Sequence, residues 1–227
     1  MNRSRVLPVA VSLTVAAALL LTGCGGGDRK GSGNGKLVGA DTGSAKRGAS
    51  PSSSAMSKVP HIDRPDMKFP ADVELVFDDA GVTDPDQAAA LGDAENFVRA
   101  VIYGIVEQDA DDAVYKFYSE FQSPAQKYAK QQIDASVGAG LTVTGVSRYT
   151  GAKIQSVNGT KDVVVTFCSN DSRFYSKETD SGKIRKTKMS VRDYSYWQIG
   201  MHPKKATDGL WRANEIKVQG DAARCVG

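Results

Sequence analysis

The chain has 227 residues, of which 41% are hydrophobic and 24% charged. This composition is that of a globular protein, and it excludes collagen, coiled coils and a chain disordered throughout. A formal charge of +3 is too small for a dedicated nucleic-acid-binding protein, and two histidines leave little material for a zinc site. Three cysteines are too few for a small disulfide-rich scaffold.

Residues 1–24 have the pattern of a lipoprotein signal peptide. Arg3 and Arg5 supply the positive start, and the apolar stretch 6–21 follows. The stretch Leu-Thr-Gly-Cys that ends at Cys24 matches the bacterial lipobox, where a peptidase cleaves before a cysteine that carries diacylglycerol. The apolar stretch is shorter than the roughly 20 residues that span a bilayer, which disfavours an uncleaved membrane anchor. We therefore expect acyl chains on Cys24 to hold the protein on the outer side of the cytoplasmic membrane.

Residues 25–65 are predicted to be a disordered tether, rich in Gly and Ser, and residues 66–227 a folded domain. Charge is unevenly divided along the chain. Residues 63–112 carry 14 acidic and 3 basic side chains, whereas residues 113–227 carry 18 basic and 10 acidic ones. An acidic face opposite a basic face is one interpretation. Solvated faces that partly neutralise each other in the fold are favoured.

A short strand and three helices are predicted first. Alternating apolar residues indicate a strand within 69–77, and Asp84 followed by proline starts a long helix. The second helix covers 111–119, and the third begins at Ser123, again before proline, and ends near Gly138. Within one arc of about 140°, the first helix carries a core-facing apolar stripe. The stripe consists of Phe97, Val98, Val101, Ile102 and Ile105. The second helix is expected to present Ala113, Val114, Phe117 and Tyr118 on one side.

After Gly140 the apolar period changes to two, which predicts strands to the end of the chain. The predicted strands cover 141–149, 152–157, 162–168, 172–177, 190–200 and 210–218. Asn158-Gly159 is typical of a hairpin turn. Helices followed by strands predict an α+β domain, with three N-terminal helices packed on a curved antiparallel sheet of five to six strands.

This order resembles the nuclear transport factor two superfamily, the cone-shaped fold shared with ketosteroid isomerases. The resemblance rests on AENFVRAVIYGIVEQDADDAVYKFYS (94–119) and on DGLWRANEIKV (208–218). Residues 66–227 also look like uncharacterised actinobacterial lipoproteins of that superfamily, through the lipobox, the FPADVELVF lead-in and a late pair of cysteines. None of these patterns is catalytic, so the resemblance implies a fold and leaves activity open. Dimers are common in the superfamily, and the oligomeric state of this chain stays open.

Two cysteines remain once Cys24 is assigned to lipid. In an exported chain, pairing of Cys168 with Cys225 is the expectation. The alternative, two free thiols with a redox role, lacks a CxxC motif. The disulfide would fasten the last strand to the sheet.

The resemblance to ketosteroid isomerases implies an Asp base aimed into the cone, with Tyr and protonated Asp as donors. Alternation along 190–200 places four candidate pocket residues on one face, namely Val191, Asp193, Ser195 and Trp197. On such a face the pKa of Asp193 would be raised, and the carboxylate could act as a base. The simpler interpretation, in which Asp193 lies in water or pairs with Arg192 or Lys188, is favoured, since a lone carboxylate is weak evidence. Tyr103 points away from the core stripe.

The basic run 183–188, followed by Arg192, could contact anionic wall polymers or phospholipid head groups, although a solvated loop tip is the ordinary explanation. No metal or cofactor motif is recognised, and His61 and His202 lack ligand spacing. The sequence thus predicts a non-enzymatic lipoprotein of the cell envelope that binds a small apolar ligand or an envelope partner, without nucleic acid or cofactor. The alternatives are an isomerase- or dehydratase-like enzyme with Asp193 as base, and adhesion to wall polymer through 183–188.

Overall fold

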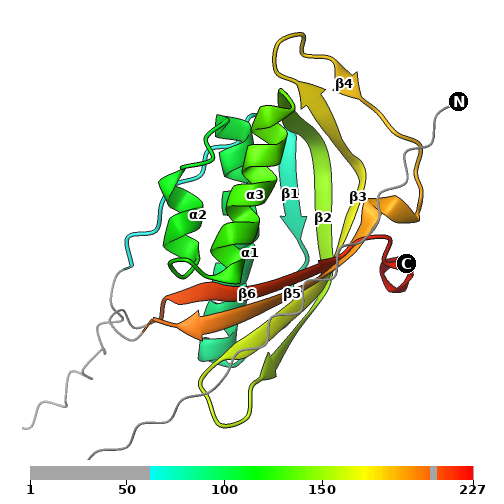
Figure 1. The fold of residues 1–227 in the computed structure, drawn as a ribbon. Helices are drawn as coiled ribbons and strands as arrows, with labels where there is room; N and C mark the ends of the chain where they lie inside the picture. Colours follow the sequence, from blue (N-terminus) through cyan, green and yellow to red (C-terminus); the bar gives the residue numbers. More distant parts are fainter. Residues whose placement is uncertain (1–61, 205–208, 227) are drawn as a thin grey trace, which may run out of the picture. The chain divides into compact units, whose positions relative to one another are not determined.

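Three helices cover one face of a six-stranded sheet (Figure 1). The computed structural model describes residues 62–204 and 209–226. All of its elements fall within one compact unit, Ala55–Gly227. The elements follow the chain as β1 Val73–Phe77, α1 Pro85–Glu107, α2 Ala113–Tyr118, α3 Pro124–Gly138, β2 Leu141–Ser156, β3 Val163–Glu178, β4 Ile184–Arg185, η1 Val191–Asp193, β5 Tyr194–Pro203, β6 Trp211–Gln219 and η2 Ala223–Cys225. The predicted α+β class is confirmed.

The starts of α1 and α3 are set by local side chains, as predicted. The Asp84 carboxylate accepts a hydrogen bond from the backbone N–H of Gln87 (2.9 Å), and a proline opens the helix. Ser123 does the same for α3 through the backbone N–H of Gln126 (3.1 Å). These caps satisfy N–H groups that have no partner within the helix.

The apolar stripe of α1 faces the sheet. Four of its five predicted members are buried, and Ile102 is half-buried. The face predicted for α2 is partly wrong, since Ala113 is exposed and Tyr115 is buried. The Tyr115 hydroxyl donates to the carbonyl of Ala110 (3.0 Å), so the polar end of this buried side chain has a partner.

The strand order is β1-β2-β3-β5-β6, and β4 pairs with β3. All neighbours are antiparallel except β1, which runs parallel to β2. The predicted purely antiparallel sheet is therefore wrong at this edge, and the sheet is mixed. The three helices lie between β1 and β2 in the chain, and a crossover of that length lets the second strand return in the same direction.

Two pairs of predicted strands are merged into two long strands. β2, Leu141–Ser156, joins the strands predicted over 141–149 and 152–157, and β3, Val163–Glu178, joins those predicted over 162–168 and 172–177. The predicted interruptions are irregularities in the β2–β3 pairing, where the register shifts. Bulges of this kind bend a strand without ending it, which curves the sheet around the helices. The hairpin turn with Gly159 (φ 78°) lies between β2 and β3, as expected.

The end of the chain is fastened to β3. Cys168 and Cys225 form the expected disulfide, with Cα atoms 5.4 Å apart and 57 residues apart in sequence. Cys168 lies beside Tyr196 of β5 on the face of the sheet turned away from the helices, and the Arg224 guanidinium stacks on the Tyr196 ring (4.6 Å). The C-terminal turn therefore packs against the back of the sheet.

The start of the described chain is fastened as well. Arg64, which the sequence assigned to the tether, forms two hydrogen bonds of 3.0 Å with the Asp93 carboxylate on α1. Asp93 is 1% exposed and also accepts from the backbone N–H of Trp211 (2.9 Å). One buried carboxylate thus joins the N-terminal lead, α1 and β6.

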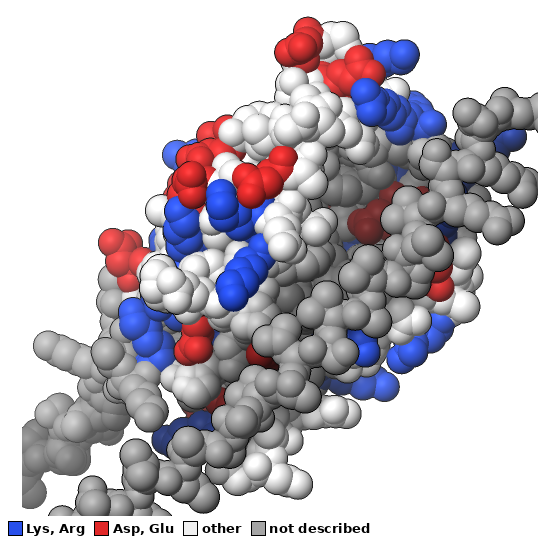
Figure 2. Space-filling view, viewed as in Figure 1, with Lys and Arg blue, Asp and Glu red and all other residues white. Residues whose placement is uncertain are grey.

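Acidic and basic segments lie beside each other in the fold. Figure 2 shows both kinds of side chain interspersed over the helical layer. Arg148 pairs with Asp78 and Lys177 with Asp72, in each case between the basic and the acidic part of the sequence (3.0 Å each). None of the described helices is both long and apolar enough to span a membrane.

Candidate functional site

Asp193 lies in a turn and not within a strand. Residues Val191–Asp193 form one turn of 3-10 helix, and β5 starts only at Tyr194, so the predicted strand over 190–200 begins later than expected. The Asp193 carboxylate accepts a hydrogen bond from the backbone N–H of Ser190 (2.7 Å), as part of a capping box. This local hydrogen bonding is the reason why the chain turns here. It also occupies one oxygen of the carboxylate.

The other predicted pocket residues are divided by this turn. Ser195 and Trp197 lie on β5, opposite Ser169 and Phe167 of β3, on the face that packs under the helices. Val191 lies before the strand and is 42% exposed. The structure therefore brings Ser195 and Trp197 together and leaves Val191 at the surface.

Asp171 on β3 is a carboxylate that the sequence analysis did not single out. The alternate residues of β3 that precede it are buried under the helices, and Asp171 continues this series. Val146 pairs with Arg173, and Arg148 pairs with Asn170, so that Ser147 of β2 faces two residues of β3. Asp171 is one of these two, at a β-bulge.

Two serines donate hydrogen bonds to the Asp171 carboxylate. The Ser147 hydroxyl donates to one oxygen, and the Ser169 hydroxyl donates to the other (3.2 Å). The indole N–H of Trp197 in turn donates to the Ser169 oxygen (3.1 Å). Both serines are fully buried, whereas Asp171 keeps part of its surface exposed. Within the described residues no cation forms an ion pair with Asp171.

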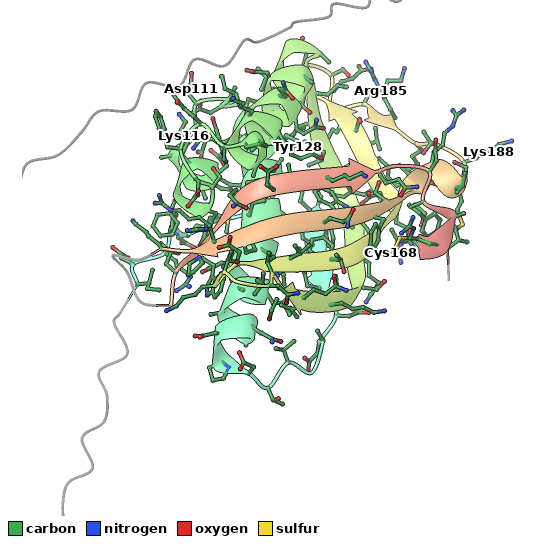
Figure 3. All side chains as sticks on the ribbon, turned by 60° about the horizontal axis from the view of Figure 1, so that its bottom comes forward. Asp111, Lys116, Tyr128, Cys168, Arg185 and Lys188 are labelled. Atoms are coloured by element: carbon green, nitrogen blue, oxygen red, sulfur yellow. A yellow bond between two sulfur atoms is a disulfide. The ribbon has the colours of Figure 1, made fainter. Side chains whose placement is uncertain are left out.

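A cluster of aromatic rings lies near this carboxylate. Tyr128 projects from α3 toward the sheet (Figure 3), and its ring meets that of Trp197 edge to face, with centroids 6.2 Å apart. Trp197 also stacks on Phe167 (6.0 Å) and contacts Tyr149 (6.4 Å). Tyr149 and Phe167 are buried, while Tyr128 and Trp197 are half-buried. The cluster is joined to the carboxylate through Ser169, to which Trp197 donates, and the charge of Asp171 acts on the phenols of Tyr128 and Tyr149.

The surroundings of the site shift the pKa values of its ionisable side chains. Burial raises the pKa of Asp171; the hydrogen bonds from Ser147 and Ser169 oppose the rise, and the negative charge of Asp193 adds to it. Burial raises the pKa of Tyr128 to about 12, with a contribution from the charge of Asp171. The same two causes raise the pKa of Tyr149. Both phenols therefore stay protonated at neutral pH, when they can act as hydrogen-bond donors.

The arrangement can accept a hydrogen bond from a ligand, or a proton, at a carboxylate that water solvates poorly. Of the predicted pocket residues, Ser195 and Trp197 lie on β5 next to this group, opposite Ser169 and Phe167 of β3. The sequence analysis did not identify β3 as the neighbouring strand. It missed Asp171 because the residue falls in the predicted gap between strands 162–168 and 172–177. The alternation of β3 through Phe167 and Ser169 is the signal that, continued by two residues, would have found it.

Two recesses lie elsewhere on the described surface. One of about 350 Å³ is lined mainly by residues of β3, β5 and β6 on the back of the sheet. The other, of about 1000 Å³, lies beside the start of α1, where Nδ1 of His202 is 2.7 Å from a carboxylate oxygen of Asp162. Within 62–204 and 209–226, no three or more His, Cys, Asp or Glu side chains gather as a metal ion would need.

No protein-family model matches the chain, and no curated protein is similar to it. Two solved structures are similar in fold. A nuclear transport factor 2-like superfamily protein from Salmonella enterica serovar Typhimurium is 15% identical, with 63% of this chain and 95% of that chain covered and a TM-score of 0.37. A proposed ketosteroid isomerase from Shewanella frigidimarina is also 15% identical, with 59% and 97% covered and a TM-score of 0.30. Both scores are low, so the function of this chain has to be inferred from its own side chains.

Proposed function

We propose that the domain binds a small, largely apolar molecule that carries a hydroxyl or N–H group, and that the Asp171 carboxylate accepts the hydrogen bond from this group. The observation that carries the proposal is a half-buried carboxylate with raised pKa that lies next to an aromatic cluster and, within the described residues, has no cationic partner. Placing a carboxylate there is costly for the fold unless a partner compensates it. Perturbed groups of this kind concentrate at functional sites.

The half-buried members of the site define where such a molecule would lie. Tyr128, Asp171 and Trp197 are each half-buried, and the rings of Tyr128 and Trp197 meet edge to face. An apolar ring or chain would pack on the aromatic surface, while its polar hydrogen meets the carboxylate. Few polar groups within an apolar wall are typical of small-molecule sites.

The proposal places this domain on a lipid-anchored protein outside the cytoplasmic membrane. The sequence supports it through the apolar stretch 6–21 and the lipobox that ends at Cys24. These residues, like the tether up to residue 61, lie outside the described part of the chain. In a bacterial host that acylates lipoproteins, the Cys24→Ser variant should lose membrane attachment, as measured by fractionation. Membrane retention of that variant would contradict the anchor.

The ligand proposal is tested with 2-naphthol, an apolar ring with one hydroxyl, and the unit Ala55–Gly227. At pH 8 we expect saturable quenching of Trp197 fluorescence in the wild type and on the order of tenfold or more weaker binding in Asp171→Asn, because a hydrogen bond to a charged acceptor is lost. Asp193→Asn is the matched control and should bind within about twofold of the wild type. Equal binding by Asp171→Asn, or no binding by the wild type, would contradict the proposal. Native mass spectrometry of the same unit would reveal any ligand that is retained during purification.

A second candidate function is proton abstraction by Asp171, in place of the Asp193 predicted from sequence. It is favoured by one observation: a carboxylate with raised pKa lies next to two tyrosines whose hydroxyls stay protonated. Such hydroxyls can donate hydrogen bonds to a negative charge that develops on a substrate oxygen.

5-Nitrobenzisoxazole is a general probe for a desolvated carboxylate base. The base takes the proton from C3, the N–O bond breaks, and a coloured phenolate is released. An enzymatic role predicts a saturable rate that rises with pH through the titration of Asp171 and is lost in Asp171→Asn. A rate no higher than that of free acetate, or one that Asp171→Asn retains, would exclude this role.

A further inference from the structure

The segment 183–192 combines positive charge with exposed apolar side chains. It holds five cations and no carboxylate, and every one of its residues is exposed. The cations are Lys183, Arg185, Lys186, Lys188 and Arg192. Its exposed apolar members are Ile184, Met189 and Val191. We refer to residues 183–192 as the basic loop.

The basic loop projects from the sheet at a distance from the helices. Its only strand, β4, pairs with β3 at Ser176 and Lys177. In Figure 3, Arg185 and Lys188 lie on the opposite side of the domain from Asp111 and Lys116 of the helical region. A flat surface could therefore approach the loop without meeting α2.

Most of the charge of the basic loop is free to act on a partner. Arg185 pairs with Glu178 of β3 (3.1 Å). The other four cations form no ion pair with any part of the chain that the structure describes. A concentration of unpaired cations of this kind attracts a polyanionic surface.

The exposed apolar side chains of the basic loop indicate which kind of anionic surface it binds. Met189 is 71% exposed, and Ile184 and Val191 are 41% and 42% exposed. A soluble or wall-bound polyanion offers phosphate or carboxylate groups, which gain nothing from apolar side chains. An anionic bilayer offers both charge and a hydrocarbon boundary into which such side chains can be buried.

We propose that the basic loop docks the domain on a membrane surface rich in anionic phospholipid. The cations lie at the level of the head groups, and Met189 and Val191 enter the boundary with the acyl chains. This inference is independent of the Asp171 site, and it does not require the predicted lipid on Cys24. The sequence left two anionic partners open for 183–188, wall polymer and phospholipid head groups, and this inference selects the lipid surface.

The test is co-sedimentation of the unit Ala55–Gly227 with vesicles. This unit contains every described element and the disulfide, and it lacks the predicted anchor. We expect salt-sensitive binding to phosphatidylcholine vesicles with about one third phosphatidylglycerol and little binding to phosphatidylcholine alone. The triple variant Lys183→Ala, Lys186→Ala, Lys188→Ala should bind about fivefold more weakly per lysine removed, or on the order of a hundredfold in total.

Two further variants separate lipid from other polyanions. Lys127→Ala, Lys153→Ala, Lys217→Ala removes the same charge from exposed positions elsewhere and should bind within about threefold of the wild type. Met189→Ser, Val191→Ser should weaken vesicle binding about tenfold and leave binding to soluble polyphosphate unchanged. The proposal is overturned if the apolar variant binds vesicles as the wild type does, if the two triple variants lose binding equally, or if the wild type does not bind anionic vesicles.

Discussion

Asp171 lies where its charged form is disfavoured, and this has a consequence for stability. Since burial raises its pKa in the folded protein above the unfolded value of about 3.9, the folded state binds the proton more tightly. Stability is therefore highest below the unfolded pKa and falls as the pH rises through the raised, folded pKa.

We predict that Asp171→Asn raises the free energy of unfolding at pH 7 by about 0.5–2 kcal/mol, a range usual when a costly functional group is replaced. The amide keeps the shape of the side chain, and its oxygen can accept from Ser147 or Ser169. Denaturant unfolding from pH 4 to pH 8 should show a gain in stability of the variant over the wild type that is smallest at pH 4 and grows as the pH rises. A lower stability of the variant over this whole range would mean that the carboxylate is there for the fold.

Asp93 has the opposite role, because its charge is matched inside the fold. Arg64→Ala would leave this buried carboxylate without its cation, and we expect a loss of about 3 kcal/mol or more in the free energy of unfolding. Arg148→Ala is the control, because Arg148 and Asp78 are both half-exposed and such pairs contribute about 0–1 kcal/mol. Urea unfolding of the two variants measures the difference. Equal losses would show that Arg64 does not anchor the N-terminal lead.

At the scale of elements, the close passage of β2 and β3 depends on a glycine. Gly145 has a φ of 101°, and a Cβ at this position would collide with the backbone carbonyl oxygen of Arg173 on β3. This glycine precedes the irregular pairing at Ser147 that brings Asp171 beside that serine. The bulged part of the sheet therefore tolerates no side chain here.

Gly145→Ala should destabilise the domain by on the order of 3 kcal/mol, because both the backbone conformation and the space are unfavourable. Gly92→Ala in α1 is the matched control: a Cβ there meets no atom within 4 Å, and alanine favours a helix over glycine by about 1 kcal/mol. Thermal unfolding should lower the Tm of the first variant and leave or raise that of the second. A Tm of Gly145→Ala equal to that of the wild type would contradict the close passage.

At the scale of the whole molecule, features that depend on interactions between residues close together in the sequence could be predicted from the sequence. The caps Asp84 and Ser123 depend on hydrogen bonds within a few residues, and they were predicted correctly. The α+β class follows from the change of apolar period after Gly140. The cysteine pairing also agrees with the structure, because only two cysteines remained.

Features that depend on contacts between distant parts of the chain could not be predicted in this way. The parallel pairing of β1 depends on where the chain returns after three helices. Arg64 lies in a segment of tether-like composition, and only the position of Asp93 in space shows that it belongs to the fold. Asp171 continues the alternation of β3, but it falls in the predicted gap between two strands, and only the pairing of β2 with β3 places it beside Ser147.

We predict that the disulfide contributes a large part of the free energy of unfolding of the domain. Replacing Cys168 and Cys225 by alanine opens a loop of 57 residues, and we expect a loss of about 2–4 kcal/mol in the free energy of unfolding. Denaturant unfolding of the double variant measures the loss. A stability equal to that of the wild type would show that the pairing of β5 and β6 alone holds the chain end.

The same bond has a consequence for cleavage of the chain. The basic loop is exposed and rich in Lys and Arg, which makes it a natural target for trypsin-like proteases. It lies between Cys168 and Cys225, so a chain cut there remains a single covalent particle. Its two pieces would run as one band on a gel without reductant and as two bands after reduction. A cut in this loop would thus interrupt the proposed membrane contact while β5, β6 and the Asp171 site stay attached to the rest of the domain.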